Sequence, residues 1–400
     1  MPEISTGTTT AAGAGMAPAA PAAPAAAVEA AGLPVPPSAS SQPAPPESSR
    51  PPARSHRLPL LLCVLILCAV ALVSMAAGRY WVPPNEILRI LANEATALFG
   101  AGGGEGALRR TWTDQEATVV LDVRLPRVLL AFLVGGALSL GGACLQALFR
   151  NPLVSPDIIG VTAGASFGGV LVLTLGLSGG WMVGGAFGFG LAALAVVLAL
   201  GRMGGAGGPM LMIVLGGIVV AAFFNAMVSF ITYTADPYSE LPSIVHWLLG
   251  SIAAASYTKV LTALVPVAIG AAVVLAMRWR LNVLSLGDDD AAALGVNPHR
   301  SRVVLLCAVA LMTAGTVAVA GAVGWVGLVV PHLARLWMGP DHRVLLPASL
   351  LLGGTYLMLI DTLSRSLSSS ELPLGILTAI IGAPVFVVLL ARSQKKGALS

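Results

Sequence analysis

The chain has 400 residues, of which 56% are hydrophobic and only 10% are charged, with a mean hydropathy of +0.87. These values exclude an ordinary soluble domain and indicate a membrane protein with several spans. The net charge of +4 is too small to suggest nucleic-acid binding. None of the three lysines lies between a glycine and a Ser or Thr, which excludes a Walker A loop, so we expect ATP and Mg²⁺ to bind a separate subunit.

The N-terminal region divides into a polar tail, a first span and a mixed segment. Residues 1–57 are mostly Ala, Pro, Ser and Gly, and we expect disorder because they cannot bury enough apolar surface. The run at 58–77 is too long for the core of a signal peptide, so we expect a transmembrane helix. Residues 79–123 predict an interfacial helix and then a Gly-rich, charged excursion.

Arg124-Leu-Pro-Arg127 precedes an uncharged run, residues 128–149, that is long enough to span a bilayer. Arg150 follows at the other mouth of this span. Arginine is costly in lipid, so it either anchors at the interface or meets an anionic partner. Both interpretations of Arg124 and Arg127 stay open on these residues alone.

Further apolar runs predict a bundle of ten transmembrane helices, with an all-α fold. Small residues recur in these runs and would let helices approach closely. After the first two spans, the predicted ranges are 158–177, 181–201, 210–233, 258–278, 303–321, 322–338, 344–363 and 373–391, and a short tail covers 393–400.

Lysine and arginine are more frequent on the side of the membrane that holds both termini. The positive-inside rule therefore predicts cytoplasmic termini in a cytoplasmic (inner) membrane. In this topology Arg124, Arg127 and Arg365 face outward. Asp361 and Glu371 flank Arg365 in the sequence and could hold its guanidinium by ion pairing.

The largest predicted cytoplasmic loop covers residues 279–302. Residues 287–295 predict a short helix, because acidic residues in a first turn complement the helix dipole and Gly295 suits a left-handed cap. Asn297 and the proline after it predict a second short helix. The loop is either a solvated connection or a knob that couples to a motor subunit. Asp288, Asp289 and Asp290 would point in different directions, so we expect no metal site.

Seven stretches occur in an order and spacing that resemble the FecCD family of ABC importer permeases. The resemblance covers about residues 58–392 and leaves out the tail and the excursion over 100–120. The stretches are Arg124-Leu-Pro-Arg127, Gln146-Ala-Leu-Phe-Arg-Asn-Pro-Leu153, Gly160-Val-Thr-Ala-Gly164, Leu294-Gly-Val-Asn297, Gly324-Trp-Val-Gly-Leu-Val-Val-Pro-His332, Asp341-His-Arg-Val344, and Glu371-Leu-Pro-Leu-Gly-Ile376 with Gly382-Ala-Pro384.

The resemblance implies a type II importer: a homodimer in membrane lipid, with ATPase subunits on the cytoplasmic face and a periplasmic or lipid-anchored binding protein outside. It assigns docking of the binding protein to Arg124, Arg127 and Arg365. It assigns ATPase coupling to the loop over 287–302. The coupling residues so implied are Asp288, Asp289, Asp290, Leu294, Gly295, Val296 and Asn297.

The resemblance also implies that the helix over 210–233 lines the translocation path, with Asn225, Ser229 and Thr232 as polar candidates. These three side chains could equally bond within their own helix. The expected function is alternating-access import of an iron complex, a ferric siderophore first and haem or cobalamin second. The rival class is an ion-coupled secondary transporter, which usually needs ionisable residues at mid-membrane depth. A membrane receptor or structural protein is a weaker third option.

Overall fold

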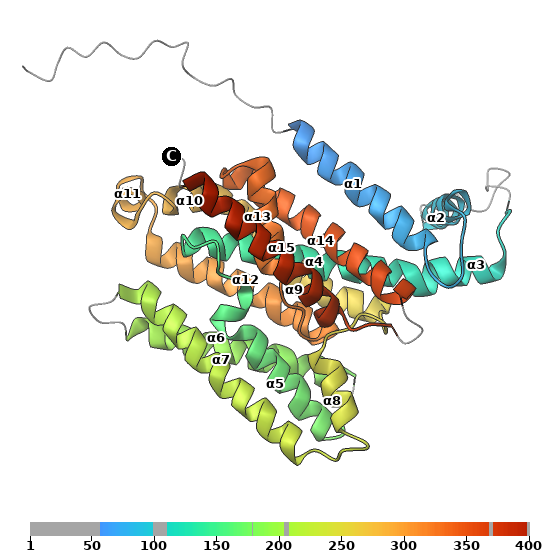
Figure 1. Ribbon diagram of the computed structural model, residues 1–400, viewed down its shortest axis with the longest axis horizontal. Helices are drawn as coiled ribbons and strands as arrows, with labels where there is room; N and C mark the ends of the chain where they lie inside the picture. Colours follow the sequence, from blue (N-terminus) through green and yellow to red (C-terminus); the bar gives the residue numbers. More distant parts are fainter. Residues whose placement is uncertain (1–56, 99–109, 178, 204–207, 368–370, 398–400) are drawn as a thin grey trace, which may run out of the picture. The chain divides into compact units, whose positions relative to one another are not determined.

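The computed structural model describes residues 57–98, 110–177, 179–203, 208–367 and 371–397, and within these ranges the chain is helical with no strand. The predicted tail, apart from Arg57, and residues 99–109 of the excursion lie outside the described residues. The helices, drawn in Figure 1, are α1 (Arg57–Ala76), α2 (Pro84–Leu98), α3 (Asp114–Thr118), the π-helix η3 (Val119–Arg124), α4 (Leu125–Leu148), the 3-10 helix η4 (Pro156–Ile159), α5 (Val161–Thr174), α6 (Gly180–Arg202), α7 (Gly208–Thr234), α8 (Leu241–Leu248), α9 (Tyr257–Ala276), α10 (Arg278–Leu284), α11 (Asp288–Ala293), α12 (Pro298–Ala320), α13 (Val326–Met338), α14 (His342–Leu367) and α15 (Leu374–Gly397).

The all-α membrane fold is confirmed, but ten full-length spans are not. Among the described residues, eight helices are long and apolar enough to cross a membrane. The other two apolar helices, α5 and α13, have 14 and 13 residues, fewer than the roughly 20 that a span needs. Positive φ angles at Gly160 and Trp325 mark the starts of α5 and α13, and one at Gly321 marks the end of α12. Helices α5 and α13 are therefore shorter than the apolar runs that contain them.

The helical run that contains the predicted span over 128–149 begins earlier, at Asp114, because α3, η3 and α4 are continuous. Thr113 opens this run with a reciprocal capping box. Pro126 lacks an N–H, so in the π register the carbonyl of Leu121 loses its partner. The hydroxyl of Tyr257 donates to that carbonyl at 2.6 Å. A contact from α9 therefore lets the proline stay inside the helix.

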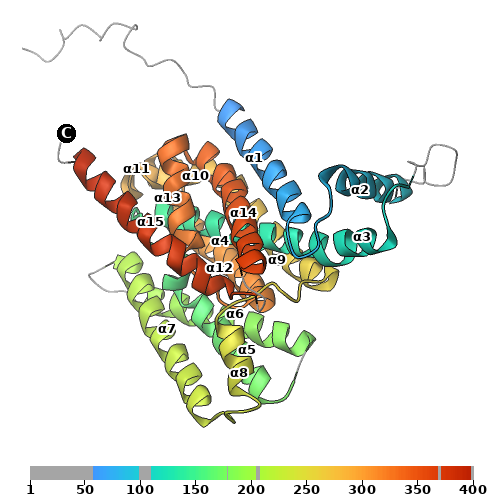
Figure 2. The ribbon, with the colours of Figure 1, turned by 45° about the vertical axis from the view of Figure 1, so that its right-hand side comes forward.

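Helix α4 lies at the centre of the bundle. It packs along α14 and also contacts α9, α12 and α13, and most of its residues are buried. Helix α1 lies against α14, as both ribbon views show (Figures 1 and 2). Helices α5, α6 and α7 pack together beside α12, with α7 at the edge of the group (Figure 2).

Glycines create the close approach of helices that the sequence predicts. A Cβ atom on Gly142 would lie 1.8 Å from the carbonyl oxygen of Gly327 in α13, and one on Gly135 would lie 2.3 Å from the carbonyl oxygen of Gly353 in α14. Neither carbonyl can move away without displacing a helix. Gly184 and Gly188 in α6, by contrast, have nothing within 4 Å of that position. Only some glycines of the pattern are therefore packing residues.

We expect Gly142→Ala to destabilise the protein, because its methyl group overlaps the backbone of α13. Overpacking of this kind costs about 1–3 kcal/mol or more. Gly188→Ala is the matched control, and we expect it to be neutral or to stabilise α6 by up to about 1 kcal/mol. Thermal unfolding of both variants in detergent measures the difference. Equal unfolding temperatures would contradict the packing role of Gly142.

Candidate functional site

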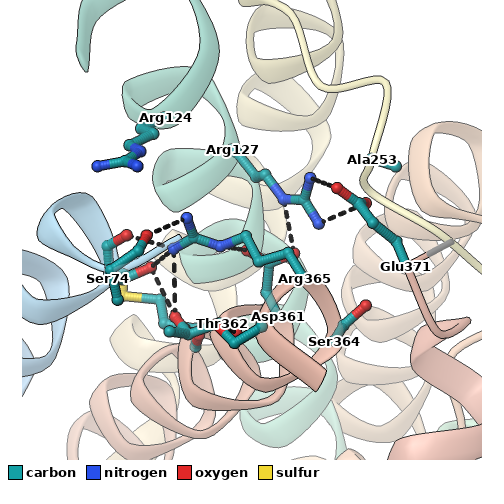
Figure 3. Close-up of polar contacts among 12 residues, drawn as sticks. Ser74, Arg124, Arg127, Ala253, Asp361, Thr362, Ser364, Arg365 and Glu371 are labelled. Carbon is teal, nitrogen blue, oxygen red and sulfur yellow. Dashed lines mark hydrogen bonds and ion pairs between the residues drawn. The ribbon is translucent and has the colours of Figure 1, made fainter. Parts of the chain in front are cut away.

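Five charged side chains gather where η3 and α4 meet the ends of α1 and α14. Arg124 and Arg127 come from η3 and α4, Asp361 and Arg365 from the last turns of α14, and Glu371 from the segment before α15 (Figure 3). We call these five residues the arginine cluster. It brings together the three arginines to which the family resemblance assigns docking.

Arg127 is held by two carboxylates from different parts of the chain. Its Nε donates to Oδ1 of Asp361 at 2.7 Å, and its two terminal nitrogens donate to the carboxylate oxygens of Glu371 at 3.1 and 2.9 Å. This paired geometry fixes the plane of the guanidinium as well as its position. The contact joins α4 to α14 and to the segment that leads into α15.

Arg124 and Arg365 together cap the end of α1. The last carbonyls of a helix lack intrahelical partners, and positive charge is favourable beside them. Both guanidinium groups donate to such carbonyls. Arg365 donates to the carbonyls of Ser74 and Ala77, and Arg124 to those of Met75 and Ala76. Arg124 also donates to the carbonyl of Tyr80, beyond the helix. A Cβ on Gly78, whose φ is +143°, would lie 3.0 Å from Arg124 and 3.2 Å from Arg365, so this turn needs a glycine.

The cluster is mostly buried. Arg124, Arg127 and Arg365 are 5%, 7% and 9% exposed, whereas the side chain of Glu371 is 37% exposed. Asp361 pairs with Arg127 and also with Nε of Arg365, at 3.4 Å. The sequence suggested that Glu371 also pairs with Arg365, but in the structure Glu371 pairs with Arg127 instead. The five side chains carry one more positive than negative charge. The three arginines thus have internal partners, and docking stays a prediction.

The predicted coupling segment lies at the opposite end of α4. Helix α11 carries three aspartates in its first turn, and Gly295 closes it with a φ of +78°, as expected. The predicted second short helix is wrong, because Asn297 caps the long helix α12 by accepting from the N–H of Arg300 at 3.0 Å. Leu294 is exposed and Val296 is buried, so the segment presents one side chain and packs the other.

Asp288 is the only aspartate of α11 for which the described residues show an ion pair. Its carboxylate pairs with Arg302 of α12 and with Arg150, which follows α4. The hydrogen bond from Arg302 lowers the pKa of Asp288, and both arginines add electrostatic attraction, so the carboxylate is ionised at neutral pH. Sequence reasoning missed both arginines, because no local pattern joins residues so far apart.

The polar residues predicted to line a path lie on α7. Ser229 and Thr232 donate to the carbonyls of Asn225 and Val228 within the helix, at 2.9 and 2.8 Å. Asn225 and Ser229 are exposed and Thr232 is half-buried. Both hydroxyls therefore bond within α7, while Asn225 and Ser229 remain accessible. That these residues line a translocation path stays a prediction.

We expect Asp361→Asn to lower the stability of the protein strongly, by about 3–5 kcal/mol, because it leaves two buried arginines without their shared counter-charge. Glu371→Gln removes a carboxylate that is partly exposed, and its cost should be about 1 kcal/mol or less. Thermal unfolding in detergent, followed by fluorescence, compares the two variants. Equally small shifts would show that Asp361 does not balance the cluster.

Comparison with known proteins identifies the family. Residues 64–392 match the FecCD transport family. The molybdate import system permease protein MolB of Haemophilus influenzae is 40% identical over 83% of this chain and 95% of its own length. An iron chelatin transport system permease protein of Helicobacter pylori is 40% identical over 69% of this chain and 83% of its own length. A solved metal-chelate type ABC transporter in an inward-facing conformation is 38% identical, with a TM-score of 0.73 over 84% of this chain and 99% of that chain. The chain belongs to the FecCD transport family and is the permease subunit of an ABC importer, with ATP hydrolysis on a separate subunit.

Proposed function

We propose that this permease imports an iron complex, a ferric siderophore, by alternating access. Two similar proteins support this choice, since one is named for iron chelatin and the other for a metal chelate. Other relatives are named for molybdate, cobalamin and hemin, so haem and cobalamin are the second candidates and molybdate joins them.

The observation that carries the proposal is the character of α7. This helix has no charged residue over its whole length, and its exposed side chains are mostly apolar. They include Leu211, Leu215, Val219, Phe223, Phe230 and Tyr233. An uncharged wall, whose few accessible polar side chains include Asn225 and Ser229, suits a large complex that must pass without being held tightly. We infer that a second copy of the chain faces this wall across the path.

The proposed orientation puts both termini in the cytoplasm and the arginine cluster outside. The binding protein would then meet the cluster, and α11 with Leu294 and Gly295 would meet the ATPase. The excess positive charge of the cluster favours an acidic partner. Glu371, the most exposed acid of the cluster, competes for Arg127, so an incoming carboxylate would take its place on the guanidinium.

We expect Glu371→Gln to increase the affinity of the binding protein, because Arg127 then has a free pair of donors for a partner carboxylate. Raising the salt concentration should weaken docking to the unaltered protein. Binding of the purified binding protein to the permease–ATPase complex measures both effects. Glu94→Gln in α2 is a control that removes a carboxylate outside the cluster. An affinity that responds neither to Glu371→Gln nor to salt would leave the arginines with their capping and pairing roles alone.

We expect deletion of the gene to abolish growth of the host on a single ferric siderophore while growth on other iron sources continues. The panel includes haem as an iron source, and cobalamin-dependent and molybdate-dependent growth as controls. Loss of growth on haem, or with cobalamin or molybdate limiting, would replace the proposed substrate. Growth like that of the parent under every condition would contradict the import role.

A further inference from the structure

Asp288 joins three helices at the end of the bundle opposite the arginine cluster. Arg302 donates from one terminal nitrogen to Oδ2 of Asp288 at 2.7 Å and from the other to Oδ1. Arg150 donates to the same Oδ1 at 3.3 Å. The carboxylate of Asp288 in α11 is therefore held by Arg302 of α12 and by Arg150, which follows α4.

Arg150 adopts a backbone conformation that usually belongs to glycine. Its φ is +48°, and the hydrogen bonds around it are those of a Schellman cap: Arg150 N–H to the carbonyl of Ala147, and Asn151 N–H to that of Gln146. Glycine adopts this conformation without steric cost. An arginine at this position therefore indicates that the contacts of its side chain are functionally important.

The side chain of Arg150 reaches two parts of the predicted cytoplasmic loop over 279–302. Besides Asp288, it donates to the carbonyl of Leu284, near the end of α10, at 2.9 Å. Both contacts are made by one terminal nitrogen, so Arg150 links the end of α4 to α10 and α11 together. A glycine would satisfy the cap and make neither contact.

Helix α4 runs from this contact to the arginine cluster, packed against its neighbours for most of its length. A displacement of α11 would thus act on α4 through Arg150 and on α12 through Arg302. We propose that Arg150, Asp288 and Arg302 form a latch that transmits movement of α11 into the bundle, with Arg150 as a positioning residue for transport. This role rests on the proposed function, in which α11 meets the ATPase.

Arg150→Gly tests the latch without disturbing the cap. Because glycine favours the left-handed conformation, the unfolding temperature should stay the same or rise. The permease–ATPase complex should still hydrolyse ATP, but the amount of substrate imported per ATP should fall by about fivefold or more. Arg150→Lys keeps a positive charge and should retain part of the coupling. Asp288→Asn weakens both ion pairs and should reduce import per ATP at least as much as Arg150→Gly.

Arg343→Gln, which removes an exposed positive charge from the first turn of α14, is the matched control and should leave import per ATP unchanged. Uptake into vesicles is measured with each member of the substrate panel and the purified binding protein. Full coupling in Arg150→Gly, with an unchanged unfolding temperature, would overturn the latch while the import function stands. Absence of ATP-dependent import by the unaltered complex with every substrate would overturn the proposed function and, with it, this role.

Discussion

The buried guanidinium of Arg127 is the contact on which the arrangement of α4 depends. A charge buried among packed helices needs counter-charges or hydrogen-bond acceptors with good geometry, because its desolvation is otherwise uncompensated. Asp361 and Glu371 supply them from α14 and from the segment before α15. Since α4 also touches α14 closely at Gly135 and Gly353, the ion pair and this contact together limit how far one helix can slide along the other.

Burial of the cluster changes how a docking role would work. An ion pair made by an exposed arginine contributes little binding free energy, because ordering the side chain costs conformational entropy. Here Arg124 and Arg365 are already ordered by the carbonyls that end α1, and Arg127 is ordered by two acids. A partner carboxylate would meet oriented donors and would have to exchange with Glu371. Docking would then be coupled to the position of α1 and of α14.

Much of the helical framework could be predicted from apolar runs, because a chain in lipid has few alternatives to helices. The interruption between α12 and α13 and the left-handed cap at Gly295 were also predictable from local residues. The start of the second span was not, because the hydroxyl of Tyr257 makes a helical Pro126 acceptable from a distant part of the chain. Helix-start signals at Asn297 likewise mark where a helix begins but not how long it continues.

The sequence could place arginines at the ends of spans but could not show what their side chains contact. The partners of Arg124 are backbone carbonyls, which carry no residue signature. Arg150 contacts the carbonyl of Leu284 and the carboxylate of Asp288, which is distant in the sequence, and its left-handed backbone conformation follows from the Schellman cap and not from its residue type. In both cases the arginine lies where a sequence pattern suggests only a polar boundary.

Two groups of ion-paired side chains lie at the two ends of α4, while α7 has no charged residue. A fixed charge beside a translocation path would bind an oppositely charged ligand and slow its release, since passage requires weak binding. Charges at the ends of α4 do not have this effect, because their partners are other residues of the bundle. An uncharged α7 and charged helix ends would suit the proposed import of a large complex by alternating access.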